Sequence, residues 1–315
     1  MKLVNAFFKL IRWPNLVFIA LTQFLFYFSL FRSLIISPLP QIFSAFYFLL
    51  LLSASVFIAA GGYIINDYFD MHIDSINKPN RVVIDKVVKR RWAIVWHFVL
   101  SGFGILLSLF FSFKTGNWII AIGNIGCVLL LWFYSTTFKK KLLIGNVIIS
   151  ALTAWVILVL YFAYTFMANR TGDWNLNAYG FDVRKLFKYT AVFAGFAFII
   201  SLIREVVKDL EDMEGDARYN CTTMPLAWGI PATKVFVAVW MIVTIAALLI
   251  IQLYAWQLGH QLIVLYSIVF VILPLAYLLK LLYNATSAKH YHSISRYIKF
   301  IMLAGILSMS FFYFS

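Results

Sequence analysis

Nine apolar segments, each long enough to cross a lipid bilayer, constrain the fold of this chain more than any other feature. A helix needs about 20 largely apolar residues to span the hydrocarbon core, and it satisfies its backbone polar groups internally. The segments lie at roughly 14–34, 42–66, 92–113, 117–135, 142–168, 187–208, 234–254, 260–283 and 295–314. We therefore predict an all-α polytopic membrane protein with nine transmembrane helices, folded as one domain over residues 1–315.

Composition indicates that lipid rather than water surrounds most of the chain. Charged residues make up 12% of the sequence, whereas soluble domains carry about a quarter. The first apolar segment has spanning length, so we interpret it as a retained helix rather than a secretory signal. The net charge of +14 would favour nucleic-acid binding in a soluble protein. Here the basic residues lie in short loops, which predicts contact with the membrane and no nucleic-acid partner.

The basic residues also predict the orientation of the chain, because Lys and Arg accumulate in cytoplasmic loops. With a cytoplasmic N-terminus and nine alternating spans, 20 of the 26 Lys and Arg fall on the cytoplasmic side. The six that fall outside are Arg32, Lys114, Arg170, Arg184, Lys185 and Lys188. We therefore predict an integral membrane protein with a cytoplasmic N-terminus and a C-terminus outside, which in a prokaryotic cell would lie in the cytoplasmic membrane.

Acidic residues are scarce, and most of them form two clusters. Nine of the twelve Asp and Glu belong to these clusters, which stand at the ends of the second and sixth apolar segments. The first cluster reads Asn66-Asp67-x-x-Asp70-x-x-x-Asp74. The second reads Glu205-x-x-x-Asp209-x-Glu211-Asp212-x-Glu214-Gly215-Asp216. Both fall on the predicted cytoplasmic side, so we expect an active site at that face.

Both clusters space their aspartates at i, i+3 and i+7. At about 100° per residue, three such carboxylates lie within about 60° of one another on a helix. Like charges on one helical face repel, so a cation is expected to compensate them. Mg²⁺ takes one or two carboxylates and shares its other positions with water and phosphate oxygens. We therefore predict that two opposed aspartate faces bind Mg²⁺ and a diphosphate, with the metal ligands Asp67, Asp70, Asp74, Asp209, Asp212 and Asp216.

Two other interpretations of these clusters stay open. They could be solvated acidic helix ends, although two copies of one spacing in a chain so poor in acids favour a metal site. They could also belong to a transporter, in which ionisable residues are expected near mid-membrane. The centres of these spans are nearly uncharged. The acidic clusters therefore favour an enzyme over a transporter.

Basic side chains stand beside the acidic clusters on the same predicted side. Asn77-Lys78-Pro79-Asn80-Arg81 follows the first cluster, and Lys139 follows the fourth apolar segment. A departing diphosphate needs cations to neutralise it, so Lys78, Arg81 and Lys139 are candidates for binding it. Their neighbouring Lys and Arg are interpreted as topology signals alone. The five His share no metal-binding spacing, and we expect His290-x-His292 to be solvated in a loop.

Together these motifs resemble those of the UbiA superfamily of intramembrane prenyltransferases. The similarity covers both aspartate motifs, the stretch 77–81, and Tyr134-Ser135…Lys139…Gly145-Asn146 between them. It implies nine helices around a central cavity with a polar cap over the cytoplasmic mouth. It also implies that the enzyme, with Mg²⁺, ionises a prenyl diphosphate, and that an acceptor captures the prenyl cation.

Residue roles follow from the same resemblance. Asn66 and the aspartates of the first motif match the family's first site for metal and diphosphate, and those of the second motif match its second site. Arg81 and Lys139 match positions that contact the diphosphate. The predicted catalytic residues are Asp67, Asp70, Asp209 and Asp212.

The second cluster also bears on the identity of the acceptor. The stretch 204–216 looks most like the branch of the family that moves a geranylgeranyl group onto geranylgeranylglyceryl phosphate, giving an ether lipid. The resemblance therefore implies a prenyl diphosphate donor and a lipid acceptor. Chlorophyll synthases also carry Glu-Gly-Asp in this motif, so an aromatic acceptor of quinone or tetrapyrrole biosynthesis is the alternative.

Overall fold

The computed structural model describes residues 2–34, 44–77, 82–170 and 183–313. Within these ranges nine helices are long and apolar enough to cross a membrane, which confirms the predicted number of spans. The β-structure of the described part is limited to one isolated bridge between Ile84 and Val88. The prediction of an all-α fold is therefore confirmed.

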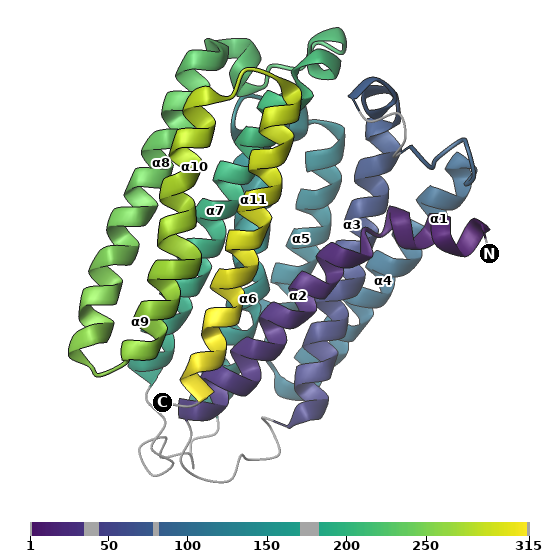
Figure 1. The fold of residues 1–315 in the computed structure, drawn as a ribbon. Coiled ribbons are helices and arrows are strands. Elements are labelled where there is room, and N and C mark those ends of the chain that lie inside the picture. Colours follow the sequence, from purple (N-terminus) through teal and green to yellow (C-terminus); the bar gives the residue numbers. More distant parts are fainter. Residues whose placement is uncertain (1, 35–43, 78–81, 171–182, 314–315) are drawn as a thin grey trace. The chain divides into compact units, whose positions relative to one another are not determined.

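The helices are labelled in chain order in Figure 1. They are α1 Lys2–Leu10, α2 Trp13–Leu25, α3 Ala45–Asn77, α4 Arg90–Thr115, α5 Trp118–Thr136, α6 Ile144–Arg170, α7 Val183–Arg218, α8 Met224–Gln257, α9 Gln261–Ser267, α10 Leu273–Asn284 and α11 Ala288–Leu307. Short π-helical or 3₁₀ turns adjoin several of them: η1 Phe26–Phe31, η2 Arg32–Leu34, η4 Phe138–Lys140, η6 Ile268–Ile272 and η7 Ser308–Tyr313.

Two helices extend well beyond the apolar segments that predicted them. Helix α3 continues to Asn77 and α7 continues to Arg218, so both acidic clusters are helical. Only the part of a helix inside the hydrocarbon core has to be apolar, whereas its backbone hydrogen bonds can continue past that core. The two aspartate faces therefore stand on helices that are continuous with membrane spans.

Proline and glycine shape three of the other spans. Pro14 lies in the first turn of α2, where its missing N–H leaves no helical bond unmade. Pro274 lies in the first turn of α10. This helix directly follows the π-helical turn η6, which itself follows α9. Gly229 breaks α8 with φ 83° and ψ 162°, two residues before Pro231. Gly229 therefore divides α8, and the longer part of this helix begins close to residue 234, where the apolar segment was predicted to start.

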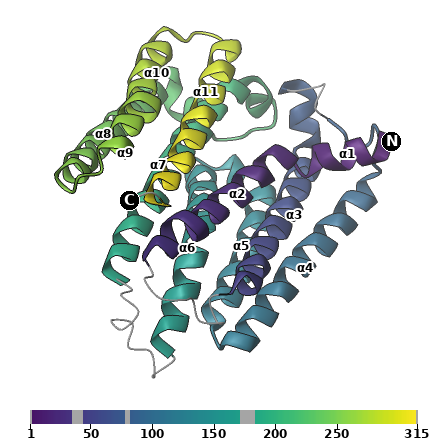
Figure 2. The same cartoon turned by 60° about the horizontal axis from the view of Figure 1, so that its bottom comes forward.

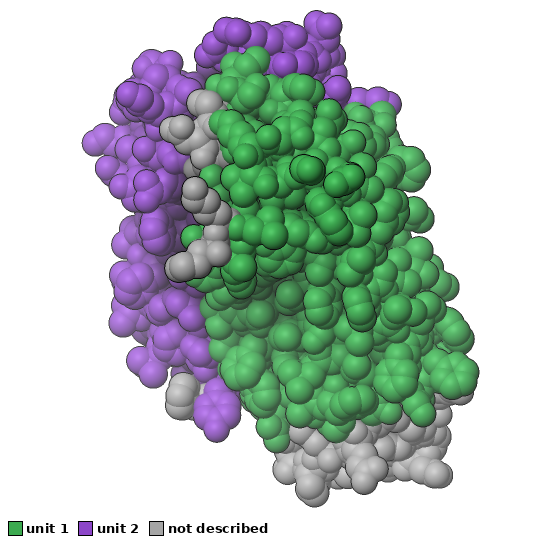
Figure 3. Space-filling view, turned by 90° about the vertical axis from the view of Figure 1, so that its right-hand side faces the viewer, with its two compact units in different colours: residues 1–138, 155–191 green, residues 139–154, 192–315 purple. Residues whose placement is uncertain are grey.

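The chain forms two compact units, which Figure 3 shows in green and purple. Unit 1 contains residues 1–138 and 155–191, and unit 2 contains residues 139–154 and 192–315. In unit 1, helix α3 packs against α2, α4 and α5, and Figure 2 shows it between α2 and α4. In unit 2, α10 packs against both α8 and α11.

Small residues bring α3 and α4 close together. A Cβ atom on Gly104 would lie 3.0 Å from the carbonyl oxygen of Ala54 and 3.2 Å from the backbone nitrogen of Ile58. About two helical turns away, the buried His97 contacts the carbonyl oxygen of Gly61 through Nδ1 at 3.0 Å. Lipid is as apolar as a leucine side chain, so close backbone approach drives such packing in membranes.

Buried polar side chains join α4, α5 and α6 within unit 1. Asn124 donates from Nδ2 to Oγ of Ser108 at 2.8 Å, and its Oδ1 accepts from Nε1 of Trp155 at 2.9 Å. Interhelical hydrogen bonds of this kind contribute about 1 kcal/mol each in membranes. Unit 1 is therefore held by close packing along α3 and by this polar chain across its other helices.

The α3–α4 contact predicts a difference between two glycines on the same helix. Gly104→Ala should destabilise the protein by about 1–3 kcal/mol, because the added methyl group overpacks a tight backbone contact. Gly102→Ala is the matched control, since a Cβ there meets nothing within 4 Å. Thermal unfolding in detergent should show a lower midpoint for the first variant alone, and equal midpoints would contradict this account of the packing.

Candidate active site

The first acidic cluster occupies the C-terminal end of α3. Because the helix is continuous to Asn77, its three aspartates share one face. Asp70 is 3% exposed and accepts a hydrogen bond of 2.6 Å from Nδ2 of Asn66. The other amide atom, Oδ1 of Asn66, is buried and has no hydrogen-bond partner among the described residues. An oxygen acceptor beside two carboxylates can therefore bind a cation.

Arg12 neutralises part of this cluster. Its Nη2 lies 2.5 Å from Oδ1 of Asp67, and its guanidinium lies over the ring of Tyr63 at 5.4 Å. The charge of Asp67 raises the pKa of Arg12 above its ordinary value. Arg12 has left-handed backbone angles, φ 50° and ψ 52°, between α1 and α2. The residue at the junction of α1 and α2 is therefore also the residue that pairs with Asp67.

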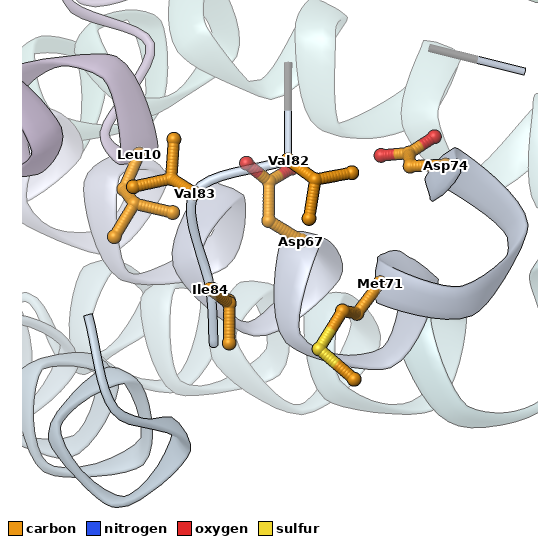
Figure 4. A pocket seen from close by; sticks show the side chains of 7 residues that line it. All are labelled: Leu10, Asp67, Met71, Asp74, Val82, Val83 and Ile84. Carbon is orange, nitrogen blue, oxygen red and sulfur yellow. The ribbon is translucent and has the colours of Figure 1, made fainter. Parts of the chain in front are cut away.

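A small pocket lies next to the same carboxylates (Figure 4). Figure 4 shows Asp67 and Asp74 directing their carboxylates toward the side of α3 on which Val82 lies. The pocket is lined by Leu10, Asp67, Met71, Asp74, Val82, Val83 and Ile84. The predicted diphosphate-binding residues Lys78 and Arg81 lie outside the described residues, immediately before this lining segment.

The second acidic cluster occupies the C-terminal end of α7, in unit 2. Asp209, Asp212 and Asp216 again share one face of a continuous helix. Asp209 accepts a hydrogen bond of 2.8 Å from Nδ2 of Asn146, near the start of α6. Asp216 is 5% exposed. Each cluster thus has one aspartate held by the amide of an asparagine.

Glutamates of the same stretch form ion pairs. Glu205 lies 2.7 Å from Nη1 of Arg204 and 2.8 Å from Nζ of Lys208. Glu211 lies 2.9 Å from Nδ1 of His292 on α11. The expectation that His292 is solvated in a loop is therefore wrong, because α11 begins at Ala288 and directs this ring to α7. In sequence the two partners are 81 residues apart, so local pattern gave no sign of the pair.

Lys139 belongs to the same unit as the second cluster. It is half-buried in η4, and the loop after α7 is hydrogen-bonded to the neighbouring residue. Thr222 donates to the carbonyl oxygen of Lys140 from both its backbone nitrogen and its Oγ1, each at 2.8 Å. The structure therefore brings the segment that carries Lys139 to the segment that follows the second cluster.

Two contacts of the clusters were missed in the sequence. Arg12 stands out in the sequence only as a cation directly before the first span, and Asn146 only as part of the stretch that resembles the family. Neither feature indicates which residue is contacted, because Arg12 and Asp67 are 55 residues apart and Asn146 and Asp209 are 63 residues apart. Both side chains belong to the site because each contacts a predicted metal ligand.

The donor set suits a metal that keeps part of its shell for other ligands. Within the described part of the chain, no three His, Cys, Asp or Glu side chains converge as a ready metal cage. Mg²⁺ does not need such a cage, since it binds through one or two carboxylates and completes its shell with water and phosphate oxygens. The aspartate faces and the buried Oδ1 of Asn66 are hard oxygen donors of that kind.

Two enzymes resemble this chain in sequence. A digeranylgeranylglyceryl phosphate synthase from Methanosphaera stadtmanae is 30% identical over 265 residues, 84% of this chain and 87% of that protein. The enzyme of the same name from Sulfurisphaera tokodaii is 32% identical over 284 residues, 88% of each chain. The similarity to both relatives thus extends over most of the chain.

Solved structures share the fold. A UbiA homolog from Archaeoglobus fulgidus bound to GPP and Mg²⁺ matches with a TM-score of 0.58 at 12% identity, covering 97% of this chain and 99% of that one. A structure of a digeranylgeranylglyceryl phosphate synthase matches with a TM-score of 0.60 at 24% identity, covering 98% and 99%. The model of the UbiA prenyltransferase family matches residues 26–303. The chain therefore belongs to the UbiA prenyltransferase family.

Proposed function

We propose that this prenyltransferase moves a geranylgeranyl group from its diphosphate to the free hydroxyl of geranylgeranylglyceryl phosphate. Membership of the family makes the chain an integral membrane enzyme that transfers prenyl groups. The observation that carries the choice of acceptor is the similarity, over 84% and 88% of the chain, to two enzymes named for making this product.

The two aspartate faces are proposed to bind Mg²⁺ and the donor diphosphate. Asp67, Asp70 and Asp74 with Oδ1 of Asn66 would provide oxygens from α3. Asp209, Asp212 and Asp216 would provide oxygens from α7. A UbiA homolog bound to GPP and Mg²⁺ supports this assignment. Bound Mg²⁺ would stabilise the negative charge that develops on the departing diphosphate.

The protein's own side chains would assist the same bond cleavage. The allylic C–O bond breaks and its electron pair leaves with the diphosphate, whose charge Lys78, Arg81 and Lys139 are proposed to neutralise. The acceptor oxygen then bonds to the allylic carbon and loses its proton to the diphosphate or to a motif carboxylate. Apolar spans would keep the prenyl chain in lipid and keep water from the cation.

The proposed orientation places this chemistry at the cytoplasmic face. The excess of Lys and Arg in alternate loops supports a cytoplasmic N-terminus and an outer C-terminus. Helices α3 and α7 both end in the loops that this count assigns to the cytoplasm. A water-soluble diphosphate head group would then reach the aspartates without crossing the membrane.

Loss of one aspartate from either face should reduce turnover strongly. We expect Asp70→Asn and Asp212→Asn to lower kcat by about a hundredfold or more, because the departing charge loses preorganised stabilisation. The matched controls are Asp85→Asn, at an exposed residue between α3 and α4, and Glu214→Gln, whose side chain is 74% exposed on α7. Prenyl transfer in liposomes measures the effect, and near-normal turnover in either aspartate variant would remove that face from the mechanism.

Acceptor competition should identify the product. With geranylgeranyl diphosphate and Mg²⁺, the purified protein should prenylate geranylgeranylglyceryl phosphate in preference to 4-hydroxybenzoate. Product should disappear with EDTA and return when Mg²⁺ is restored, because the carboxylates alone cannot stabilise an anionic leaving group. Prenylated hydroxybenzoate as the main product, detected by mass spectrometry, would replace the lipid acceptor with an aromatic one.

Terminal tags should report the orientation. In intact bacterial spheroplasts that express the protein, we expect a protease added outside to remove a C-terminal tag and to spare an N-terminal one. The excess of positive charge in the proposed cytoplasmic loops is the physical reason. Permeabilised cells are the control, in which both tags should be cleaved. Removal of the N-terminal tag alone from intact spheroplasts would invert the proposed topology.

A further inference from the structure

A group of three charges lies on α7, on the N-terminal side of the second aspartate face. Glu205 is 9% exposed at its side chain, and it contacts Arg204, 19% exposed, and Lys208, 26% exposed. All three lie at the C-terminal end of the apolar segment predicted at 187–208, in a helix that is a candidate membrane span. Ionisable side chains held partly out of water at such a position are costly to retain, which favours a function for them.

The group carries more positive charge than its own pairing requires. One cation is enough to neutralise Glu205, whereas two contact it, one at each carboxylate oxygen. Counted by itself, the group of Arg204, Glu205 and Lys208 has a net charge of +1. Glu205 therefore fixes the positions of two cations without cancelling both of them.

Arg204 has hydrogen-bonding capacity left over. Its pair with Glu205 uses Nη1, while Nε is buried and has no partner among the described residues. The edge formed by Nε and Nη2 can donate two parallel hydrogen bonds, an arrangement that matches two oxygens of a phosphate. A buried donor without a partner is unfavourable, so an oxyanion that reaches it would be bound strongly.

Arg204 and Lys208 lie on α7 close to the predicted metal ligands of the same helix. Arg204, Lys208 and Asp212 follow one another at i, i+4 and i+8 and share one face of α7. The opposite face, with Ile203, Val206, Val207 and Leu210, is buried in the core of unit 2. At about 1.5 Å per residue, Arg204 lies about 7.5 Å along the axis from Asp209.

We propose that Arg204 and Lys208 bind the phosphate of the acceptor, a role that rests on the proposed function because it requires a phosphorylated lipid. In a glyceryl phosphate that already carries one ether, at most three carbons separate the reacting hydroxyl from the phosphate-bearing oxygen. A phosphate site must therefore lie close to the metal-binding aspartates, and this group does. It would also discriminate against a neutral acceptor.

The test compares two acceptors that differ only in the phosphate, geranylgeranylglyceryl phosphate and geranylgeranylglycerol. For Arg204→Gln and Lys208→Gln, we expect KM for the phosphorylated acceptor to rise about tenfold to a hundredfold. The KM for geranylgeranyl diphosphate should change less than about twofold, and the preference for the phosphorylated acceptor should fall by the same factor as its KM rises. Arg204→Lys should restore part of the affinity because it keeps the charge.

Arg218→Gln is the matched control. Arg218 also lies on α7 and also pairs with a glutamate, Glu214, but its side chain is 61% exposed. This variant should keep the wild-type preference. If Arg204→Gln does not yield folded protein, Lys208→Gln carries the same comparison, since its more exposed side chain can be removed with less disturbance.

The outcomes separate this inference from the proposed function. If the wild type uses the phosphorylated acceptor but both variants keep its KM and preference, the phosphate site is wrong and the proposed function stands. A rise in donor KM alone would assign the cations to the donor diphosphate instead, and an equal loss of kcat with both acceptors would leave only a structural role. If the wild type uses no phosphorylated acceptor, both proposals fail.

Discussion

Repulsion among clustered carboxylates is the constraint on which both halves of the site depend. Three aspartates share one face of α3, and three share one face of α7. In each group an asparagine amide holds one carboxylate, at 2.6 Å on Asp70 and 2.8 Å on Asp209. An amide places a positive dipole beside a carboxylate without adding a charge, so both groups keep a net negative charge for a cation. Arg12 adds one positive charge to the first group, in its ion pair with Asp67.

The length of two helices determines where these charges can stand. Carboxylates in the centre of an apolar span would be strongly unfavourable, whereas a loop would not keep three of them on one face. Helices α3 and α7 solve both problems because they continue to Asn77 and Arg218, past their apolar segments. Within its apolar part, α3 packs closely against α4 at Gly61 and Gly104. This packing holds the part of α3 that precedes its charged end.

Sequence alone predicted most of the fold, because apolar length and helical period are local properties. It gave the nine spans, the faces that carry Asp67, Asp70 and Asp74, and those of the second cluster. It missed the contacts of Arg12, Asn146 and His292, because each partner lies more than fifty residues away in the chain. It also missed the helix of residues 2–10, which is too short to register as a span. The central cavity, the polar cap and the roles of Lys78 and Arg81 stay predictions.

Ion pairs in an apolar helix need a reason beyond stability. Removing two charges from water costs more than their attraction often returns, so a buried pair can commonly be replaced by apolar residues of similar volume without loss. The core of unit 2 shows that apolar residues were available on the same helix, since Val206 and Val207 are fully buried beside Glu205. Three charges at Arg204, Glu205 and Lys208 are thus a poor solution to packing alone. They are a good solution to binding an anion, because the carboxylate fixes two cations in place before the anion arrives, which reduces the entropy lost on binding. The same logic explains the asparagines: both devices order a charged side chain in advance while leaving its charge available to a ligand.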